Sequence, residues 1–170
     1  FFPDYWIHRY DDLIARQARI YRLDEKLVWS LIYEETYFRA LKHGAADEVG
    51  LMQVRPAIVR EWAKATGLKE YEKAAENPEQ VLADPEQNIQ IGCWYLEKLR
   101  EMYRGVPAET ALTLAAYNAG PSRVEGWTVG VKISDISEDE FISRITIPST
   151  KSYVTKILER YRMQTSEIKK

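Results

Sequence analysis

The amino-acid sequence predicts an all-α globular domain. Apolar residues recur every three or four positions in several separate segments, and no segment of useful length alternates apolar with polar residues. The sequence contains no internal repeat and no low-complexity tract. Its 170 residues, 45% hydrophobic and 29% charged, are enough for one substantial core. We therefore expect a single domain over residues 1–170, built from about six helices.

The first two helices are expected at 10–21 and 27–38. The first has apolar residues near one face at helical spacing. Asp24 lies just before the second and is a suitable N-cap, because a carboxylate can accept a hydrogen bond from a free amide of the first turn. The second helix is amphipathic, and it carries two consecutive carboxylates near its end.

The middle of the chain contains two further helices. Pro56 suits a first helical turn, and the pattern then runs to Gly67. Residues 69–83 are rich in charge, and we expect a surface connection with a short helical turn. Asp84–Pro85 is a good start for a helix that continues to Gly105, in which Gly92 would allow a close helix crossing.

The last part of the chain is expected to hold a buried helix and a terminal helix. Residues 107–118 are almost wholly apolar from Ala111 to Tyr117, which indicates a central helix. Residues 127–144 show no clear period and predict a long surface excursion. The final helix is expected from Ser149 to beyond Tyr161.

Glu35 is the candidate catalytic residue. It follows Leu31 by four positions, so its side chain is expected near the centre of the apolar face, whereas Glu34 is turned about a quarter of the way round. Burial raises the pKa of a carboxyl group, which keeps a general acid protonated near neutral pH. The alternative is a structural carboxylate paired with Arg39 or Lys42. Position alone does not decide between the two readings.

Composition excludes several other classes of function. The net charge of −2 provides no basic surface for nucleic acid. Cys93 is the only cysteine, so no internal disulfide can form, and its apolar surroundings predict a buried thiol. His8 and His43 have no partners at metal-ligand spacing, so we expect neither a metal nor a cofactor. The 11 tyrosines and five tryptophans suit flat, partly polar ligands such as sugars, although they also fill cores.

Five short segments add to the interpretation of Glu35. In chain order they are Glu35-Thr36-Tyr37-Phe38, Gly50-Leu51-Met52-Gln53, Asn88-Ile89-Gln90-Ile91-Gly92-Cys93-Trp94-Tyr95-Leu96, Ala116-Tyr117-Asn118-Ala119-Gly120 and Tyr153-Val154. In this order they resemble the soluble lytic transglycosylase family, the goose-type lysozyme-like group of peptidoglycan-cleaving domains. The resemblance covers about residues 10–158.

The resemblance implies a lysozyme-like fold and a lytic transglycosylase activity without a cofactor. Such an enzyme cleaves the β-1,4 bond between N-acetylmuramic acid and N-acetylglucosamine and leaves 1,6-anhydro-muramic acid ends. Counting back three positions from Phe38 selects Glu35 as the general acid and base, and Tyr153 would support it. The implied substrate-binding residues are Thr36, Met52, Gln53, Tyr117 and Asn118.

The sequence departs from the family pattern in three places. Thr36 stands where serine is usual, and residues 46–49 are larger than the small residues usual before Gly50. Residues 149–152 read Ser-Thr-Lys-Ser where Glu-Thr-Arg-x is usual. The catalytic acid is retained in spite of these changes.

Two rival functions remain on the same fold, and one remains outside it. A hydrolytic muramidase would need a second carboxylate, for which Asp47 and Glu48 are the candidates. A non-catalytic glycan-binding or assembly module would be expected to lack the acid, and a generic helical interaction domain would leave the five ordered segments unexplained. The resemblance implies peptidoglycan glycan strands as the partner and the periplasm or cell envelope as the location. We expect a monomer, with a possible membrane anchor outside this sequence.

Overall fold

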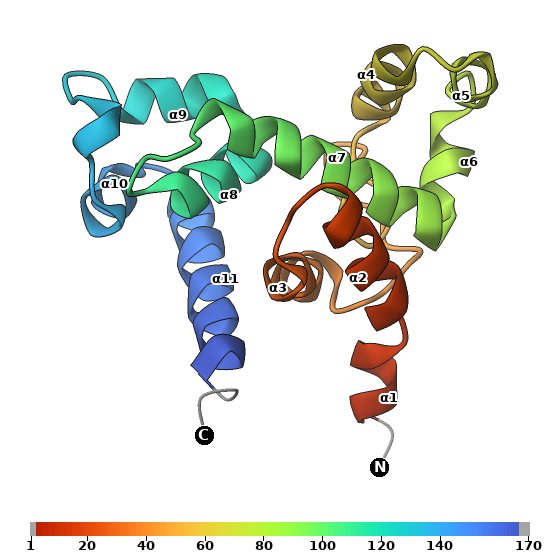
Figure 1. Cartoon of the computed structure of the whole chain (residues 1–170), viewed down its shortest axis with the longest axis horizontal. Helices are drawn as coiled ribbons and strands as arrows, with labels where there is room; N and C mark the ends of the chain where they lie inside the picture. Colours follow the sequence, from red (N-terminus) through yellow and green to blue (C-terminus); the bar gives the residue numbers. More distant parts are fainter. Residues whose placement is uncertain (1–2, 167–170) are drawn as a thin grey trace. The chain divides into compact units, whose positions relative to one another are not determined.

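The computed structural model describes residues 3–166, in which it contains the α-helices α1 to α11 and one short 3-10 helix, η1 (Figure 1). No extended strand occurs among these residues; two isolated β-bridges join His43 to Val49 and Val49 to Val54. The all-α prediction is therefore confirmed. Within the described residues, no helix combines the length and hydrophobicity needed to cross a bilayer.

The chain divides into two compact units, Phe1–Tyr95 and Leu96–Lys170. Helix α7 (Pro85–Met102) begins in the first unit and ends in the second. The expectation of a single domain over residues 1–170 stays a prediction. Each unit is described separately below.

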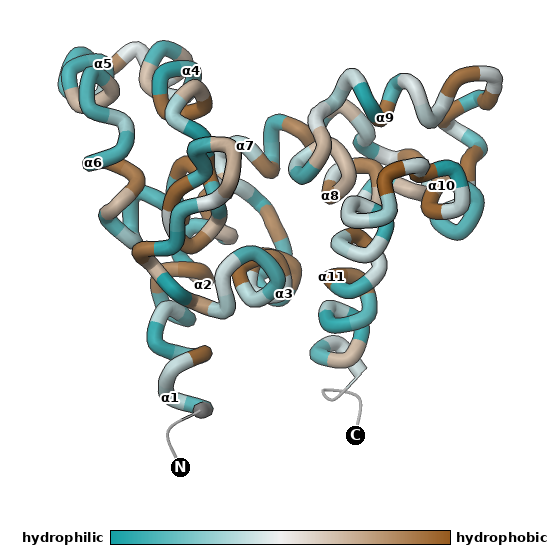
Figure 2. Tube along the Cα trace, turned by 180° about the vertical axis from the view of Figure 1, so that it is seen from behind, coloured by the Kyte–Doolittle hydropathy of each residue, from teal (hydrophilic) through white to brown (hydrophobic). Residues whose placement is uncertain are grey.

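The first unit contains six complete helices and the start of α7. They are α1 (Pro3–His8), α2 (Asp11–Ile20), α3 (Glu25–Thr36), α4 (Pro56–Thr66), α5 (Lys69–Ala74) and α6 (Pro78–Ala83). Helix α2 packs on α3, and α4 packs on both α5 and α6. Figure 2 shows hydrophobic residues on α3 and a mainly hydrophilic α5. The largest fully buried side chains of this unit include Trp62, Phe38, Ile14, Leu31, Ile32, Leu51, Met52, Leu82, Ile89 and Ile91.

Residues 69–83 differ from the sequence prediction. They form two short helices, α5 and α6, rather than a surface connection with one turn. Val81 and Leu82 of α6 are buried against the unit's core, and Leu82 has no exposed surface. An amphipathic segment of only six residues is too short for a periodicity argument, so its buried face was not recognised.

The second unit is centred on α8 (Glu109–Ala119), which packs on three other helices. These are α9 (Pro121–Trp127), α10 (Glu138–Arg144) and α11 (Pro148–Ser166). Leu112, Leu114, Ala111, Ala115 and Ala116 of α8 are buried, as expected for a central helix. The small alanine side chains of α8 allow neighbouring helices to pack closely against it.

The predicted surface excursion at residues 127–144 is wrong. This segment contains η1 (Ile133–Asp135) and α10, and Phe141 of α10 has no exposed surface. Ile136 and Ile145 on either side of α10 are also buried. Single apolar residues spaced along a short, mainly charged segment therefore anchor it to the core without giving a detectable period.

Candidate active site

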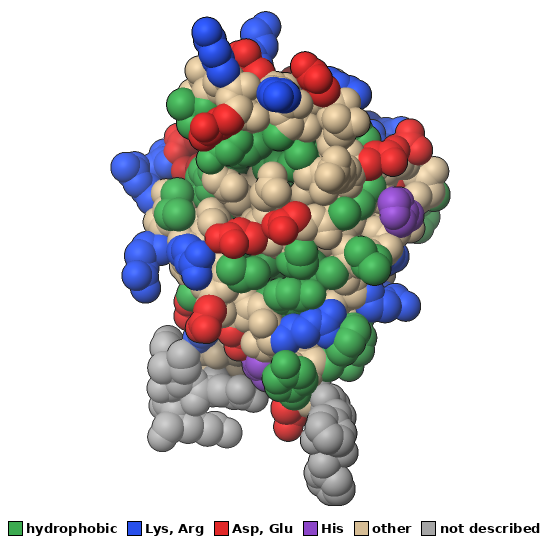
Figure 3. All heavy atoms as spheres, turned by 90° about the vertical axis from the view of Figure 1, so that its right-hand side faces the viewer, with side chains coloured by type: hydrophobic (Ala, Val, Ile, Leu, Met, Phe, Trp, Pro, Cys, Tyr) green, Lys and Arg blue, Asp and Glu red, His purple; other side chains and the backbone are tan. Residues whose placement is uncertain are grey.

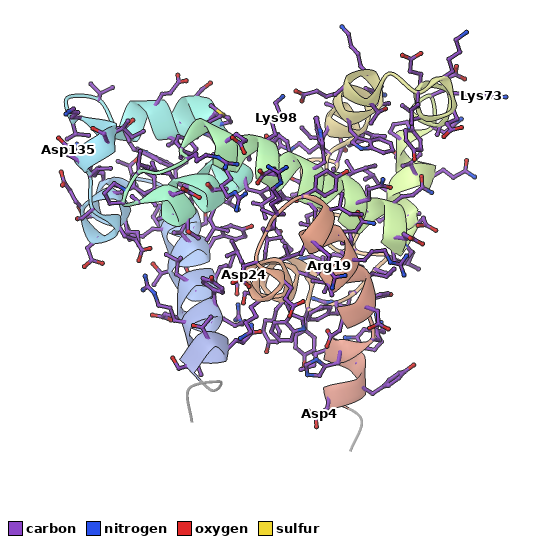
Figure 4. The ribbon with its side chains drawn as sticks, in the orientation of Figure 1. Asp4, Arg19, Asp24, Lys73, Lys98 and Asp135 are labelled. Carbon is purple, nitrogen blue, oxygen red and sulfur yellow. The ribbon has the colours of Figure 1, made fainter. Side chains whose placement is uncertain are left out.

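Helix α3 places Glu35 near its C-terminal end. The helix begins after Asp24 (labelled in Figure 4), whose carboxylate accepts a hydrogen bond from the Lys26 amide at 2.8 Å. This confirms the predicted N-cap. Leu31 and Ile32 are fully buried, and Glu35 is half-buried rather than at the centre of the buried face. Glu34 is half-buried too, so burial alone does not separate the two carboxylates.

The helix ends two residues earlier than predicted, at Thr36. Tyr37 and Phe38 both take left-handed backbone conformations, with φ of 50° and 60°. Such conformations are unfavourable for large side chains and persist where the surroundings fix them. Here the reversal carries the Phe38 side chain into the core, where it is fully buried, and leaves Tyr37 42% exposed.

Four side chains donate hydrogen bonds to the backbone carbonyls of residues 35–38, where the chain turns away from α3. The Arg39 Nε donates to Thr36 O at 3.0 Å, and the Trp6 Nε1 donates to Tyr37 O at 2.9 Å. The carbonyls on either side, those of Glu35 and Phe38, accept from Lys42 Nζ and Arg9 Nη2, respectively. The last carbonyls of a helix lack partners within the helix, and cations are favoured there by the helix dipole.

These contacts concern the alternative that Glu35 is a structural carboxylate held in an ion pair. Arg39 and Lys42 are the two cations that the sequence offered as ion-pair partners for its carboxylate. In the structure both side chains donate to backbone carbonyls of the α3 end. Their positions are thus explained by helix capping, and the structural ion pair is not needed to account for them.

The Gly50–Gln53 loop is attached to this end of α3. The Thr36 hydroxyl, on a residue only 1% exposed, hydrogen-bonds to Leu51 O at 3.0 Å and to Ile32 O at 3.2 Å. Gly50 has a φ of 79°, and a Cβ there would lie 2.1 Å from Asn88 Nδ2. The left-handed backbone angle and the close approach of Asn88 are two separate reasons for glycine at this position.

Two of the predicted substrate-binding residues of this unit are buried. Thr36 uses its hydroxyl on backbone carbonyls, and the Met52 side chain is fully buried against Gly92 of α7. Both side chains therefore help to fix the loop, and their contact with substrate stays a prediction. The close crossing expected at Gly92 is likewise made by a loop side chain, that of Met52, rather than by a second helix.

Gln53 is half-buried and closes the loop on itself. Its Nε2 donates to Gly50 O at 2.9 Å and to Lys42 O at 3.0 Å, and its own φ is 49°. These two bonds use both protons of the amide nitrogen, which leaves the amide oxygen as the group that could meet a ligand. Substrate binding by Gln53 stays a prediction.

Asn88 is a residue of this site that the sequence interpretation did not assign. It lies in α7 with no exposed surface, and its Oδ1 accepts from the Met52 amide at 2.9 Å. Its Nδ2 donates to Val49 O at 2.8 Å and to Leu82 O at 2.9 Å. An asparagine beside Ile89 in an otherwise apolar stripe was the available signal, because a buried amide needs partners outside its helix.

The remaining predicted site residues belong to the second unit. On α8, Tyr117 is half-buried and Asn118 is exposed. Asn118 Oδ1 accepts a hydrogen bond from the Thr150 hydroxyl of α11 at 2.7 Å. Tyr153 lies one turn further along α11 and is 7% exposed. The second unit thus joins Asn118 to Thr150, one turn before Tyr153 on α11, whereas contact between Tyr153 and Glu35 stays a prediction.

The two candidates for a second catalytic carboxylate, Asp47 and Glu48, have other surroundings. Burial of Glu48 disfavours its charge, but hydrogen bonds from the Ala46 and Glu48 amides and from Arg55 outweigh this and lower its pKa. Asp47 lines a cavity of about 620 Å³ together with Arg60 and residues around α6. The contacts of Glu48 account for its side chain without a catalytic role.

The described residues show no metal-binding cluster, and their one cysteine is buried. Residues 3–166 contain no group of three or more His, Cys, Asp or Glu side chains placed to hold a metal ion. Figure 3 shows acidic and basic side chains scattered over one face of the molecule. Cys93 is buried, and burial raises the pKa of its thiol.

Comparison of the sequence with known proteins finds similarity to lytic transglycosylases. The sequence model of the transglycosylase SLT domain matches residues 12–139, a range that includes Glu35, the Gly50–Gln53 loop, Tyr117 and Asn118 and ends before Tyr153. The soluble lytic murein transglycosylase of Salmonella typhimurium is 28% identical over 149 residues, 88% of this chain and 22% of that protein. The membrane-bound lytic murein transglycosylase E of Buchnera aphidicola is 28% identical over 92% of this chain and 67% of that protein.

Solved structures show the same fold. The 70 kDa soluble lytic transglycosylase of Escherichia coli matches 92% of this chain and 24% of its own, with a TM-score of 0.76 and 27% identity. A complex of the 70 kDa soluble lytic transglycosylase with bulgecin A matches 95% of this chain with a TM-score of 0.79. The lysozyme-like, all-α fold of lytic transglycosylases is thus confirmed, although this chain spans only about a quarter of these enzymes. With its family model matched over most of its length, the chain belongs to the transglycosylase SLT domain family.

Proposed function

We propose that the chain is a catalytic domain that cleaves the β-1,4 bond between N-acetylmuramic acid and N-acetylglucosamine in peptidoglycan. The products would carry 1,6-anhydro-muramic acid ends, because a hydroxyl group of the sugar, rather than water, completes the reaction. Family membership and the relatives named lytic murein transglycosylases support this proposal.

The observation that carries the proposal is the set of hydrogen bonds that fixes the Gly50–Gln53 loop at the end of α3, next to Glu35 in the sequence. This half-buried carboxylate lies one residue before Thr36, whose hydroxyl fastens the Gly50–Gln53 loop to the end of α3. From α7, Asn88 bonds to the Met52 amide of the same loop and to the Val49 carbonyl just before it, and a third hydrogen bond joins it to Leu82 of α6. A catalytic acid must be held in a defined position relative to substrate, and this arrangement provides that support.

One carboxylate is sufficient for this chemistry. Glu35, protonated, would give its proton to the glycosidic oxygen as the bond from C1 to that oxygen breaks. The C6 hydroxyl oxygen of the same muramic acid would then bond to C1, and the Glu35 carboxylate would take the hydroxyl proton. Glu35 ends in its starting protonation state, and the attacking group is already attached to the substrate, which favours the reaction through proximity.

Hydrolysis would normally require a second carboxylate. Asp47 and Glu48 were the candidates, and the Glu48 carboxylate already accepts hydrogen bonds from the Ala46 amide and from Arg55. Neither the contacts of Glu48 nor the cavity lined by Asp47 supports a hydrolytic muramidase.

The other site residues would act on the substrate or on Glu35. Tyr153 would hydrogen-bond to Glu35 and orient it, and its near-complete burial suits a positioning role. The exposed Asn118, the half-buried Tyr117 and the Gln53 amide oxygen would line the sugar-binding subsites. The substrate's own 2-acetamido group would help to stabilise positive charge at C1. The protein would act on the glycan strands of the bacterial envelope, outside the cytoplasmic membrane, and as a monomer.

Product analysis tests this proposal. Purified peptidoglycan would be digested with the wild-type protein and with Glu35→Gln, and the released sugars identified by mass spectrometry. Glu34→Gln is the matched control, because it removes the neighbouring carboxylate, which is also half-buried. We expect 1,6-anhydro products from the wild type and from Glu34→Gln but not from Glu35→Gln. Reducing ends in place of anhydro ends would establish a hydrolase, and binding without either product would establish a non-catalytic module.

A further inference from the structure

A cationic cavity lies at the C-terminal end of α3, on the first unit. Its volume is about 560 Å³, and it is lined by Trp6, Arg9, Arg39, Ala40, Leu41 and Lys42. Three of these six residues are cations and none is acidic. The sequence interpretation assigned no function to this group, and the proposed reaction does not use it.

The cations of this cavity are held in place by the backbone. Arg9, Arg39 and Lys42 each donate to a carbonyl oxygen at the α3 end. The Arg9 guanidinium also stacks over Trp6, 3.3 Å from the ring centroid, and lies 4.8 Å from the centroid of Tyr10. A guanidinium fixed between rings loses little further freedom when it binds a ligand.

The same cations keep donors that the described residues do not use. Arg9 Nη1 is buried and has no hydrogen-bond acceptor among residues 3–166. Arg39 is exposed and uses only its Nε within this part of the chain, so its two terminal nitrogens remain available. Lys42 has two further ammonium protons beyond the one that it gives to Glu35 O. A buried donor without an acceptor is costly, and an anion in the cavity would satisfy it.

We propose that this cavity binds a carboxylate of the peptide stem that muramic acid carries in peptidoglycan. The inference rests on the proposed function, since it assumes that the glycan strand is the substrate. The planar guanidinium of Arg39 matches a carboxylate geometrically. Trp6 and Leu41, which are 40% and 75% exposed, offer apolar surface to the aliphatic part of the peptide. Lys42 also donates to the backbone carbonyl of Glu35, so the cavity lies at the end of the helix that carries the proposed catalytic residue.

A purely structural role predicts a different result. If the three cations only cap α3, their loss would weaken the site for every substrate equally. If they bind the stem, their loss would affect only substrates that carry one. Glycan strands with intact stems and the same strands stripped of stems by an amidase therefore distinguish the two roles.

The experiment compares Arg39→Gln with the wild type on both kinds of strand. Glutamine keeps an N–H donor for the Thr36 carbonyl while it removes the charge. We expect kcat/KM for release of anhydro products to fall about tenfold on stem-bearing strands and to change less than about twofold on stripped strands. Arg19→Gln, on α2 and outside the cavity (Figure 4), makes the same change of charge and should affect neither substrate. An equal loss on both substrates, or no loss on either, would overturn the proposal.

A binding measurement keeps this test independent of turnover. Isothermal titration of the wild type with a free stem peptide should show binding that Arg39→Gln weakens about tenfold, whether or not the protein cleaves glycan. Equal binding to both proteins would overturn the proposal. Competition by inorganic phosphate as effective as that by the stem peptide would show a general anion site and would also overturn it. Failure of the proposed function would instead appear as an absence of anhydro products from both substrates.

Discussion

Replacing Gly92 with alanine should destabilise the protein by displacing the loop beside the proposed catalytic residue. An ideal Cβ at position 92 would lie 2.4 Å from the sulfur of Met52, 2.8 Å from its Cβ and 3.0 Å from its Cε. Ordinary contacts between such atoms are about 3.5–4.0 Å. The sulfur and Cε can rotate away, but the Met52 Cβ moves only if the loop backbone moves.

Two opposing effects set the size of the change. Overpacking of a well-filled core costs about 1–3 kcal/mol. Alanine in a helix interior is favoured over glycine by about 0.5–1 kcal/mol, which offsets part of that cost. We expect Gly92→Ala to lower the free energy of unfolding by about 1–2 kcal/mol and the Tm by roughly 2–8 °C.

Gly126 in α9 provides the matched control. It is also helical, but a Cβ there meets no atom within 4 Å. Gly126→Ala should therefore leave stability unchanged or raise it by up to about 1 kcal/mol. Urea unfolding followed by circular dichroism would measure both variants, and Gly92→Ala should in addition lower activity below its unfolding temperature. A Gly92→Ala variant as stable and as active as the wild type would refute the reasoning about Met52 and the loop.

Three further predictions follow from buried or charged groups of the first unit. Asn88→Asp keeps the acceptor for the Met52 amide but faces the Val49 and Leu82 carbonyls with a carboxylate, so it should lower the free energy of unfolding by about 2–3 kcal/mol; near-wild-type urea unfolding would contradict this. The lowered pKa of Glu48 means that its ionised form stabilises the fold above the ordinary value of 4.5, and that this stabilisation is lost as pH falls through the lower folded pKa. Glu48→Gln should therefore destabilise at neutral pH and make no difference in acid below both pKa values, and a loss of equal size at all pH values would argue against it. Burial raises the pKa of the Cys93 thiol, so a thiol-specific disulfide reagent should label it only after denaturation; rapid labelling of the native protein would show that Cys93 is accessible.

The sequence predicted the helices that carry long amphipathic patterns. Asp24 as an N-cap depends on local chemistry, which a sequence displays directly. Phe141 and Leu82 were missed because each anchors a short helix, where too few residues exist to show a period.

The contacts at the end of α3 could not be predicted from local patterns. Trp6 and Arg9 bind carbonyls that lie 31 and 29 residues later in the sequence. The family resemblance implies that Thr36 contacts substrate; its hydrogen bond to Leu51, 15 residues away, adds a structural role that spacing does not reveal. Hydrogen bonds across such separations depend on the tertiary fold rather than on spacing.

The most direct test of the central claim is digestion of purified peptidoglycan in water enriched in oxygen-18, followed by mass spectrometry of the released muropeptides. If the C6 hydroxyl of muramic acid attacks C1 and Glu35 serves as both acid and base, water takes no part in the reaction. The products should then be 1,6-anhydro species that contain no oxygen-18 at C1, and Glu35→Gln should release none of them. Products heavier by one molecule of labelled water would contradict the account, because they would show that water, and a residue that activates it, completes the cleavage.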